Sequence, residues 1–252
     1  MRLTGHHALV TGGGSGVGAA IALALAEAGA IMTICGRRFE ALEAAATRHK
    51  NIHAISADVT DEASVQELYD TAQGAWGDFG IVIANAGMAE SAPAHATSLD
   101  LWQRTLSVNL TGAFLTVRPA LKPMAKSGWG RIVFIASIAG LKGAAYVAPY
   151  VAAKHGVVGL MRSLAAETAK QGVTVNAICP GYVETPMLTQ SVARIMEKTG
   201  RSETEARSLL SATNPQGRFI QPKEVADATL WLCGENAGSV TGQAISISGG
   251  EI

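Results

Sequence analysis

Short apolar runs, many of them rich in β-branched residues, alternate along the chain with longer stretches of helical periodicity. The apolar runs are predicted to be strands, at residues 7–10, 31–35, 52–57, 81–84, 132–136, 173–178 and 244–248. Helices are predicted between them, at residues 16–28, 40–49, 62–75, 98–126, 149–171 and 222–232. Near-continuous apolar strands are typical of a parallel sheet that is buried on both faces. The alternation therefore predicts the α/β class, a doubly wound Rossmann fold whose parallel sheet of about seven strands carries helices on both faces.

No linker, repeat or low-complexity tract divides the 252 residues, and chains of this length often form one α/β domain. We therefore expect a single domain over residues 1–252. A polar, partly helical insertion at about residues 182–221 interrupts the alternation before the last helix and strand. A long excursion beside a strand end is often a binding lid, so this insertion is predicted to cover the substrate.

Composition narrows the choice of partners. Twenty basic and 20 acidic residues give zero formal net charge, so no positive field would attract nucleic acid. The longest apolar stretch, residues 17–26, has about half of the ~20 residues that a membrane span needs, and no signal peptide is evident. Three scattered cysteines argue against a disulfide framework or a metal site. We expect a cytoplasmic protein that binds no metal, nucleic acid or membrane.

A glycine-rich segment, residues 12–18, follows the first predicted strand and leads directly into the first predicted helix. Glycine permits a tight turn and a close approach to a pyrophosphate, and the helix N-terminus offers free N–H groups to the anion. This position at the start of a βαβ unit predicts a dinucleotide site rather than an ordinary turn. The expected cofactor contacts in the loop are Gly12, Ser15, Gly16, Val17 and Gly18.

The end of the second predicted strand bears on the choice of dinucleotide. A carboxylate there would bind the ribose 2′-hydroxyl of NAD, whereas arginine suits the 2′-phosphate of NADP. The chain has Gly36, Arg37 and Arg38 at this point and no acid. The sequence therefore favours NADP(H), bound by Arg37 and Arg38, and disfavours S-adenosylmethionine. NAD(H) stays an alternative, because Glu40 lies close enough along the chain to reach a ribose.

Four polar residues are candidates for the chemistry. Tyr150 and Lys154 lie four residues apart on one helix face, where a cation would bring the tyrosine pKa closer to neutrality. Ser137 follows a predicted central strand, where its hydroxyl could donate to a substrate carbonyl. Asn109 is an amide in an apolar helical stretch and could bind a water chain leading to Lys154. Each also has an ordinary interpretation, as an amphipathic tyrosine, a solvated lysine, a turn cap or a core amide.

Together these motifs resemble the short-chain dehydrogenase/reductase family over essentially the whole chain. The catalytic tetrad of that family matches Asn109, Ser137, Tyr150 and Lys154. Besides Tyr150 and Lys154, the resemblance implies cofactor contacts outside the glycine loop at Asp58, Val59, Asn85, Ala86, Gly87, Pro180, Gly181, Val183 and Thr185. Within the family, residues 148–159 and 183–187 are most similar to ketoreductases of β-ketoacyl thioesters and polyketides. The insertion is similar to that of β-hydroxyacyl dehydrogenases of the β-hydroxybutyrate type.

The resemblance implies an NAD(P)(H)-dependent oxidoreductase that interconverts a ketone and a secondary alcohol by hydride transfer. Tyr150 would be the general acid in reduction and the base in oxidation, and Ser137 would hold the carbonyl oxygen. Lys154 would lower the tyrosine pKa and hold the nicotinamide ribose, and Asn109 would anchor a relay water. The expected substrate is a β-ketoacyl or β-hydroxyacyl thioester, or a related ketone.

A substrate pocket of apolar character is expected between the turn after Ser137 and the insertion. Its expected lining residues are Ile138, Leu141, Tyr146, Val147, Tyr182, Met187 and Leu188. Members of this family are usually tetramers built on two long helices, which correspond to residues 98–126 and 149–171 here. The resemblance therefore implies a homotetramer, and a charged fraction of only 16% is consistent with surface covered by other subunits.

Three other functions stay open. An NAD-dependent catabolic dehydrogenase of a small secondary alcohol or hydroxy acid would use the same tetrad. A nucleotide-binding redox regulator would share the fold without needing Tyr150 or Lys154. A structural or interaction protein would need the glycine loop only as a turn.

Overall fold

The computed structural model describes residues 2–252, whose strands form one parallel sheet. The strands are β1 (His7–Thr11), β2 (Ile31–Gly36), β3 (Ile52–Ser56), β4 (Phe79–Ala84), β5 (Gly130–Ile135), β6 (Val173–Pro180) and β7 (Ala244–Ile247). Their order across the sheet is β3-β2-β1-β4-β5-β6-β7, and every neighbouring pair is parallel. The seven predicted strands are confirmed, and each begins and ends within two residues of its predicted position.

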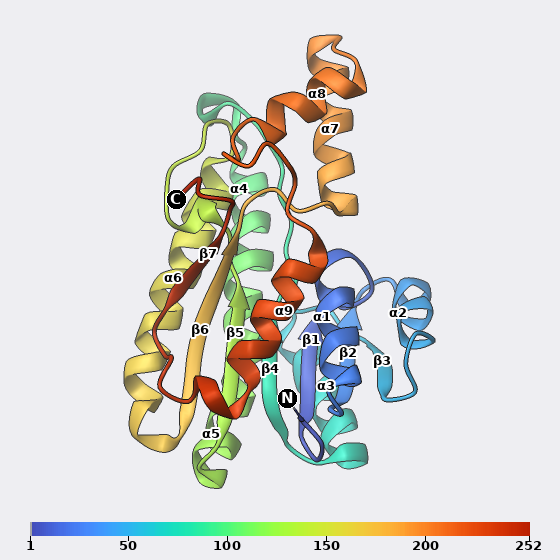
Figure 1. The fold of residues 1–252 in the computed structure, drawn as a ribbon, viewed down its shortest axis with the longest axis vertical. Helices are drawn as coiled ribbons and strands as arrows, with labels where there is room; N and C mark the ends of the chain where they lie inside the picture. Colours follow the sequence, from blue (N-terminus) through green and yellow to red (C-terminus); the bar gives the residue numbers. More distant parts are fainter. Residues whose placement is uncertain (1) are drawn as a thin grey trace.

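Helices cover both faces of the sheet (Figure 1). They are α1 (Gly16–Glu27), α2 (Phe39–Ala46), α3 (Glu62–Trp76), α4 (Leu99–Leu106), α5 (Gly112–Ser127), α6 (Ala148–Thr168), α7 (Pro186–Thr199), α8 (Glu203–Ser211) and α9 (Pro222–Cys233). One core cluster packs α3, α5 and α6 on one face, and a second packs α1, α2 and α9 on the other. Leu9 and Phe134 belong to the first cluster and their neighbours Val10 and Ile135 to the second, because successive strand residues point to opposite faces. The doubly wound fold is confirmed.

The strand order reverses between β1 and β4. From β1 the chain builds outward to β2 and β3, and from β4 it builds outward the other way. The connections after β1 and β4 therefore leave the sheet on opposite faces, which opens a crevice at the carboxyl ends of these two strands. This crevice is where a doubly wound sheet binds its ligand.

The helix predicted for residues 98–126 is interrupted. A π-helical turn, Ser107–Thr111, separates α4 from α5, and the Gly112 N–H bonds the Ser107 carbonyl five residues back. The buried Asn109 side chain donates to the Thr105 carbonyl at 2.9 Å, so it takes an acceptor that the α-helical ladder would use. A polar side chain that competes for backbone groups thus accounts for the widened turn.

The insertion consists mainly of α7 and α8, which lie beyond the carboxyl ends of the strands (Figure 1). They share a small hydrophobic cluster of their own, formed by Leu188, Val192, Ala206 and Leu210. At its base, a bridge between Val183 and Ile220 brings the two ends of the insertion together. The predicted partly helical insertion is therefore present, next to the crevice.

Two further features bear on the predicted partners. Across residues 2–252, no helix combines the length and the apolar character that crossing a bilayer requires. Cys35, Cys179 and Cys233 are all buried and carry free thiols.

Candidate active site

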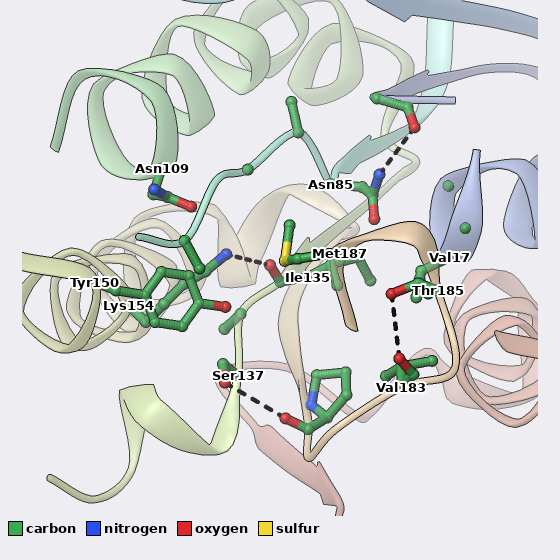
Figure 2. A pocket seen from close by; sticks show the side chains of 18 of the residues that line it. Val17, Asn85, Asn109, Ile135, Ser137, Tyr150, Lys154, Val183, Thr185 and Met187 are labelled. Carbon is green, nitrogen blue, oxygen red and sulfur yellow. Dashed lines mark hydrogen bonds between the residues drawn. The ribbon is translucent and has the colours of Figure 1, made fainter. Parts of the chain in front are cut away.

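A cavity of about 680 Å³ opens at the carboxyl ends of the strands. The four predicted tetrad residues and every predicted cofactor residue line it. Figure 2 shows Asn109, Tyr150 and Lys154 on one side of this cavity, and Val17, Val183 and Thr185 on another. Segments that are far apart in sequence therefore meet in one site.

The glycine loop between β1 and α1 forms one wall. Gly12 and Gly16 have φ angles of +66° and +54°, which residues with a side chain rarely adopt. A Cβ at Gly18 would collide with the Gly12 carbonyl oxygen. The loop closes onto the start of α1, and the first turn of that helix carries no acidic side chain to compete for its N–H groups. The wall is therefore suited to a phosphate anion.

Thr11 and Asn85 join the glycine loop to the end of β4. The Thr11 hydroxyl accepts hydrogen bonds from the N–H groups of Asn85 and Ala86, each at 3.0 Å, and the Asn85 side-chain amide donates to the Thr11 carbonyl at 2.8 Å. Thr11 is buried and was not a predicted site residue. The position of Thr11 at the end of β1 did not indicate that its hydroxyl would bind the backbone at the end of β4.

Charged side chains line the end of the cavity that lies beside β2 and β3. Arg37 and Arg38 follow β2 and are exposed, and Asp58 follows β3. Thr60 donates two hydrogen bonds to Asp58 Oδ1, at 2.9 and 2.7 Å. These bonds, with a smaller contribution from the Arg37 charge, lower the pKa of Asp58. Among the residues that line the cavity, the only carboxylates are Asp58 and Glu251, and Glu40 is not one of the lining residues.

Ser137 and Tyr150 lie at the opposite end from the arginines. Ser137 begins a short turn after β5, where its hydroxyl accepts from the Ala139 N–H at 3.1 Å and donates to the Pro180 carbonyl at 3.5 Å. Enclosure by protein raises the pKa of Tyr150 to about 12, against the opposing effect of the nearby Ser137 hydroxyl. Ser137 therefore caps a turn and also faces Tyr150 in the cavity.

Lys154 and Asn109 lie behind the tyrosine. Lys154 is buried and donates to the Ile135 carbonyl at 2.8 Å. Asn109 is fixed by the backbone of Met88, donating to its carbonyl at 2.9 Å and accepting from its N–H at 3.2 Å. A Cβ at Gly87 would lie 2.9 Å from Asn109 Oδ1 and 3.8 Å from Lys154 Nζ. The missing side chain at Gly87 therefore leaves space between these two groups.

The expected effect of Lys154 on Tyr150 is not found. Lys154 Nζ lies 5.6 Å from the centre of the tyrosine ring and points at the Ile135 carbonyl instead. Burial lowers the pKa of Lys154 to about 8 and raises that of Tyr150, because enclosure disfavours the charged form of each group. Desolvation is the largest cause of both shifts, so the tyrosine pKa is not lowered here, and the role of Lys154 toward Tyr150 stays a prediction.

The predicted apolar pocket is present with two exceptions. Ile138, Val147, Tyr182, Met187 and Leu188 line the cavity. Leu141 does not, because it packs against the core cluster that contains α6. Tyr146 does not, because its side chain is 66% exposed on a residue with φ of +67°.

Other lining residues were missed, among them Ser191, Thr213 and Glu251. Lys142 pairs with Glu251 at 2.7 Å, which joins the turn after Ser137 to the segment after β7. Two glycines with positive φ precede Glu251, Gly249 at +66° and Gly250 at +94°.

The residues present fit a nicotinamide dinucleotide. A glycine cradle that side chains would fill faces the start of α1, and paired arginines end the cavity on one side. Hydroxyl and ammonium donors end it on the other.

Comparison with known proteins agrees with this geometry. The family model for short chain dehydrogenases matches residues 6–195. The chain is 36% identical to D-beta-hydroxybutyrate dehydrogenase of Rhizobium meliloti, covering 96% of this chain and 97% of that protein. It is 39% identical to cis-4-hydroxycyclohexanecarboxylate dehydrogenase of Sinomonas cyclohexanicum, covering 96% and 95%.

A solved structure is similar over the same extent. A variant of actinorhodin polyketide ketoreductase crystallised with NADPH superposes with a TM-score of 0.95, at 36% identity, covering 100% of this chain and 99% of that one. The family match and the full-length relatives leave no large part of the chain unaccounted for. The chain belongs to the short-chain dehydrogenase/reductase family, whose members are oxidoreductases that bind NAD(P)(H).

Proposed function

We propose that this enzyme interconverts a β-ketoacyl thioester, or a related ketone, and the corresponding secondary alcohol, with NADP(H) as the preferred dinucleotide. The observation that carries the proposal is the convergence of Ser137, Tyr150 and Lys154 on the cavity that the glycine loop also lines. Bound there, the nicotinamide would supply or accept a hydride.

The chain offers a separate group for each part of the dinucleotide. The glycine loop and the start of α1 would hold the pyrophosphate, and Lys154 with Tyr150 would hold the nicotinamide ribose. Arg37 and Arg38 would hold a 2′-phosphate, since the end of β2 carries no acid to bind a free 2′-hydroxyl. This last contrast supports NADP(H) over NAD(H).

Ser137 and Tyr150 would handle the carbonyl oxygen. Ser137 would donate a hydrogen bond that orients it, and Tyr150 would release its phenolic proton to it during reduction. A pKa of about 12 keeps Tyr150 protonated at neutral pH, which is the form that reduction requires. In oxidation the same oxygen would take the proton from the alcohol.

Lys154 and Asn109 would supply the path by which Tyr150 is reprotonated. The space at Gly87 separates Asn109 Oδ1 from Lys154 Nζ, and a water held between them would contact both. The Met88 backbone holds the Asn109 amide in one orientation, which supports a positioning role for this residue.

The acyl substrate is supported by the names of the relatives and by the pocket. A hydroxybutyrate dehydrogenase and a polyketide ketoreductase are both similar along their full length. The pocket wall formed by Ile138, Val147, Met187 and Leu188 is apolar, as a short acyl chain requires. One relative named for a cyclic hydroxy acid favours a second candidate, an NAD-dependent dehydrogenase of a small secondary alcohol or hydroxy acid.

Three wider expectations belong to the same proposal. Residues 1–252 would form one domain, with α7 and α8 as a lid whose Met187, Leu188 and Ser191 face the cavity. The enzyme would be a homotetramer through α4, α5 and α6. A cytoplasmic location stays a prediction.

Initial rates with each dinucleotide test the proposal. NADPH and NADH would each be supplied with acetoacetyl-CoA and with a set of simple and cyclic ketones, and oxidation of β-hydroxybutyryl-CoA would be followed in parallel. We expect the highest kcat/KM for NADPH with the thioester. Turnover of small alcohols with NAD alone would replace the proposal by the catabolic alternative, and NADPH binding without any turnover would favour the redox regulator.

A further inference from the structure

Glu251 is a carboxylate in the wall of the cavity that the proposed chemistry does not use. Its side chain is only 8% exposed, and Lys142 Nζ contacts Oε1 at 2.7 Å. Oε2 is buried and has no hydrogen-bond partner. A buried acceptor without a partner is costly and rare in folded proteins, so this oxygen calls for an explanation.

The position of Glu251 associates it with the substrate end of the cavity. A Cβ at Gly181 would lie 3.7 Å from Oε2, and Gly181 follows Pro180, whose carbonyl accepts from Ser137. Lys142 lies in the turn after Ser137, and Tyr182 follows Gly181. The Glu251 carboxylate is therefore next to the residues that would hold the substrate carbonyl.

The ion pair has an inner and an outer end. The Lys142 side chain is 41% exposed, whereas Glu251 is almost fully enclosed. The ammonium is thus partly solvated and bound to Oε1, whereas Oε2 is covered by protein. Lys142 and Glu251 both line the cavity, so a substrate at this wall meets an ammonium that is already paired, and Oε2 becomes available to it when the carboxylate turns.

We propose that Glu251 sets the substrate class: Oε2 turns about its Lys142 contact and accepts a hydrogen bond from a neutral N–H or O–H donor next to the reacting ketone. This inference rests on the proposed function and narrows it. An amide N–H of a thioester arm or a substrate hydroxyl provides such a donor. A free carboxylate at the same place would bring two acceptors together with no proton between them, so keto acids are poor substrates.

Three compounds of similar size separate these cases. Acetoacetamide has a neutral N–H donor, methyl acetoacetate is neutral without a donor, and acetoacetate is an anion. For the wild-type enzyme with NADPH we expect kcat/KM to decrease in that order. A hydroxyketone of similar size distinguishes an O–H donor from an N–H donor.

Glu251→Gln tests the carboxylate directly. The glutamine can keep a carbonyl oxygen on Lys142 and places an NH2 donor where Oε2 was. We expect the ratio of kcat/KM for acetoacetamide over acetoacetate to fall about ten- to hundredfold. Lys142→Met retains the carboxylate and is expected to retain the preference for the amide. Glu67→Gln, on the exposed face of α3, is the matched control and should leave the ratio unchanged.

Calorimetric titration of the three compounds provides a readout without turnover. Preferential binding of acetoacetamide that Glu251→Gln abolishes would support the inference even if no compound is reduced, in which case the proposed function alone would fail. The inference would be overturned if Glu251→Gln left the amide-to-acetoacetate ratio unchanged, or if Lys142→Met lowered that ratio as much. It would also be overturned if the wild-type protein bound acetoacetate as well as the amide, or bound none of the compounds.

Discussion

Burial acts in opposite directions on the two ionisable groups nearest the proposed chemistry. It raises the pKa of Tyr150 to about 12 and lowers that of Lys154 to about 8, since enclosure disfavours the charged form of either. At neutral pH the phenol is therefore a proton donor, and the lysine remains mostly an ammonium.

The proposed dinucleotide preference depends on Arg37. Replacing it by glutamine removes a charge-assisted contact that only a 2′-phosphate can make. Arg37→Gln should lower the ratio of kcat/KM for NADPH over NADH about ten- to hundredfold. Steady-state rates with both dinucleotides measure this ratio, and Arg48→Gln, an exposed change after α2, is the control. An unaltered ratio in Arg37→Gln would exclude this arginine from phosphate recognition.

His7 makes the stability of the fold depend on pH. Its ring is buried at the start of β1 and bonds the Gly77 carbonyl and the Thr33 hydroxyl. Burial lowers the pKa of His7 below its ordinary value of 6.5, and that of His6 and His53 likewise. Below pH 6.5 the unfolded chain thus binds more protons than the folded one, and the free energy of unfolding should decrease as the pH falls.

Urea unfolding at pH 7.5 and pH 5.5 measures this effect. His7→Gln should be less stable than wild type at pH 7.5, because it loses a hydrogen bond, and should lose less stability on acidification. His95→Gln, in an exposed turn, should reproduce the wild-type difference between the two pH values. A wild-type protein equally stable at both would contradict the buried neutral imidazole.

At the scale of elements, the π-helical turn joins the helix to the loop after β4. Asn109→Ala would leave the Met88 N–H, the Met88 carbonyl and the Thr105 carbonyl without their partner. We expect a loss of about 2–5 kcal/mol in the free energy of unfolding, measured in urea, together with reduced activity. Thr111→Ala changes an exposed residue of the same turn and should stay within about 0.5 kcal/mol of wild type. If Asn109→Ala and Thr111→Ala lowered the free energy of unfolding equally, the Asn109 amide would not stabilise this turn.

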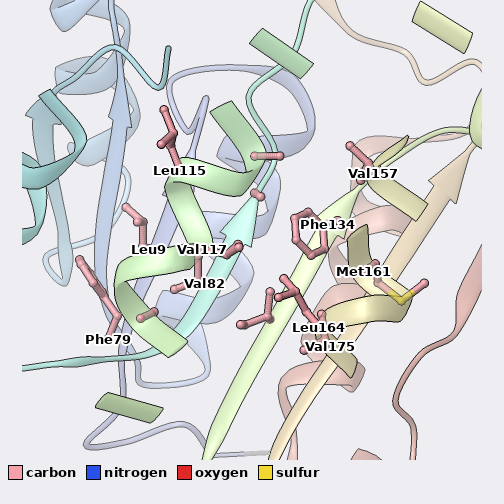
Figure 3. Packing of buried hydrophobic residues seen from close by; sticks show 14 of the residues in the cluster. Leu9, Phe79, Val82, Leu115, Val117, Phe134, Val157, Met161, Leu164 and Val175 are labelled. Atoms are coloured by element: carbon pink, nitrogen blue, oxygen red, sulfur yellow. The ribbon is translucent and has the colours of Figure 1, made fainter. Parts of the chain in front are cut away.

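The strands were predictable because most of them are near-continuous apolar runs that are buried on both faces of the sheet. Figure 3 shows Leu9, Val82 and Phe134 in the core on one face of the sheet, and the alternate residues of the same strands fill the other core. Periodicity does not reveal the π-turn, because the apolar pattern continues through Asn109. The break depends on a hydrogen bond to one carbonyl, which no pattern of hydrophobicity encodes.

The site residues were predictable where the residue type, at its position in the fold, has few structural explanations other than ligand binding or catalysis. Glycines at a strand–helix junction and a Tyr–Lys pair on a helix face indicated their neighbours in the cavity. Leu141 and Tyr146 were misplaced because they are apolar in the same way as the true lining residues, and only the backbone direction separates them. Glu251 was missed because its contact with Lys142 joins positions that are remote in sequence.

At the scale of the molecule, α4 and α6 present apolar surface. Leu99 and Trp102 are exposed and line a surface hollow together with Ala148. If this surface is covered in the proposed tetramer, Trp102→Glu should reduce the molar mass measured by light scattering to that of a dimer or monomer. Leu209→Glu, an exposed apolar residue on α8, should leave the mass unchanged. An unchanged mass in Trp102→Glu would place the assembly surface elsewhere.

The central claim is that Tyr150 transfers the proton in an enzyme of this fold, and one pair of variants tests it most directly. Tyr150→Phe and Tyr146→Phe each remove one hydroxyl, but only Tyr150 lines the cavity. We predict that Tyr150→Phe lowers kcat about 10²–10⁴-fold, while its affinity for NADPH changes by no more than a few-fold and Tyr146→Phe retains full activity. Full activity in Tyr150→Phe, with NADPH still bound, would contradict the account.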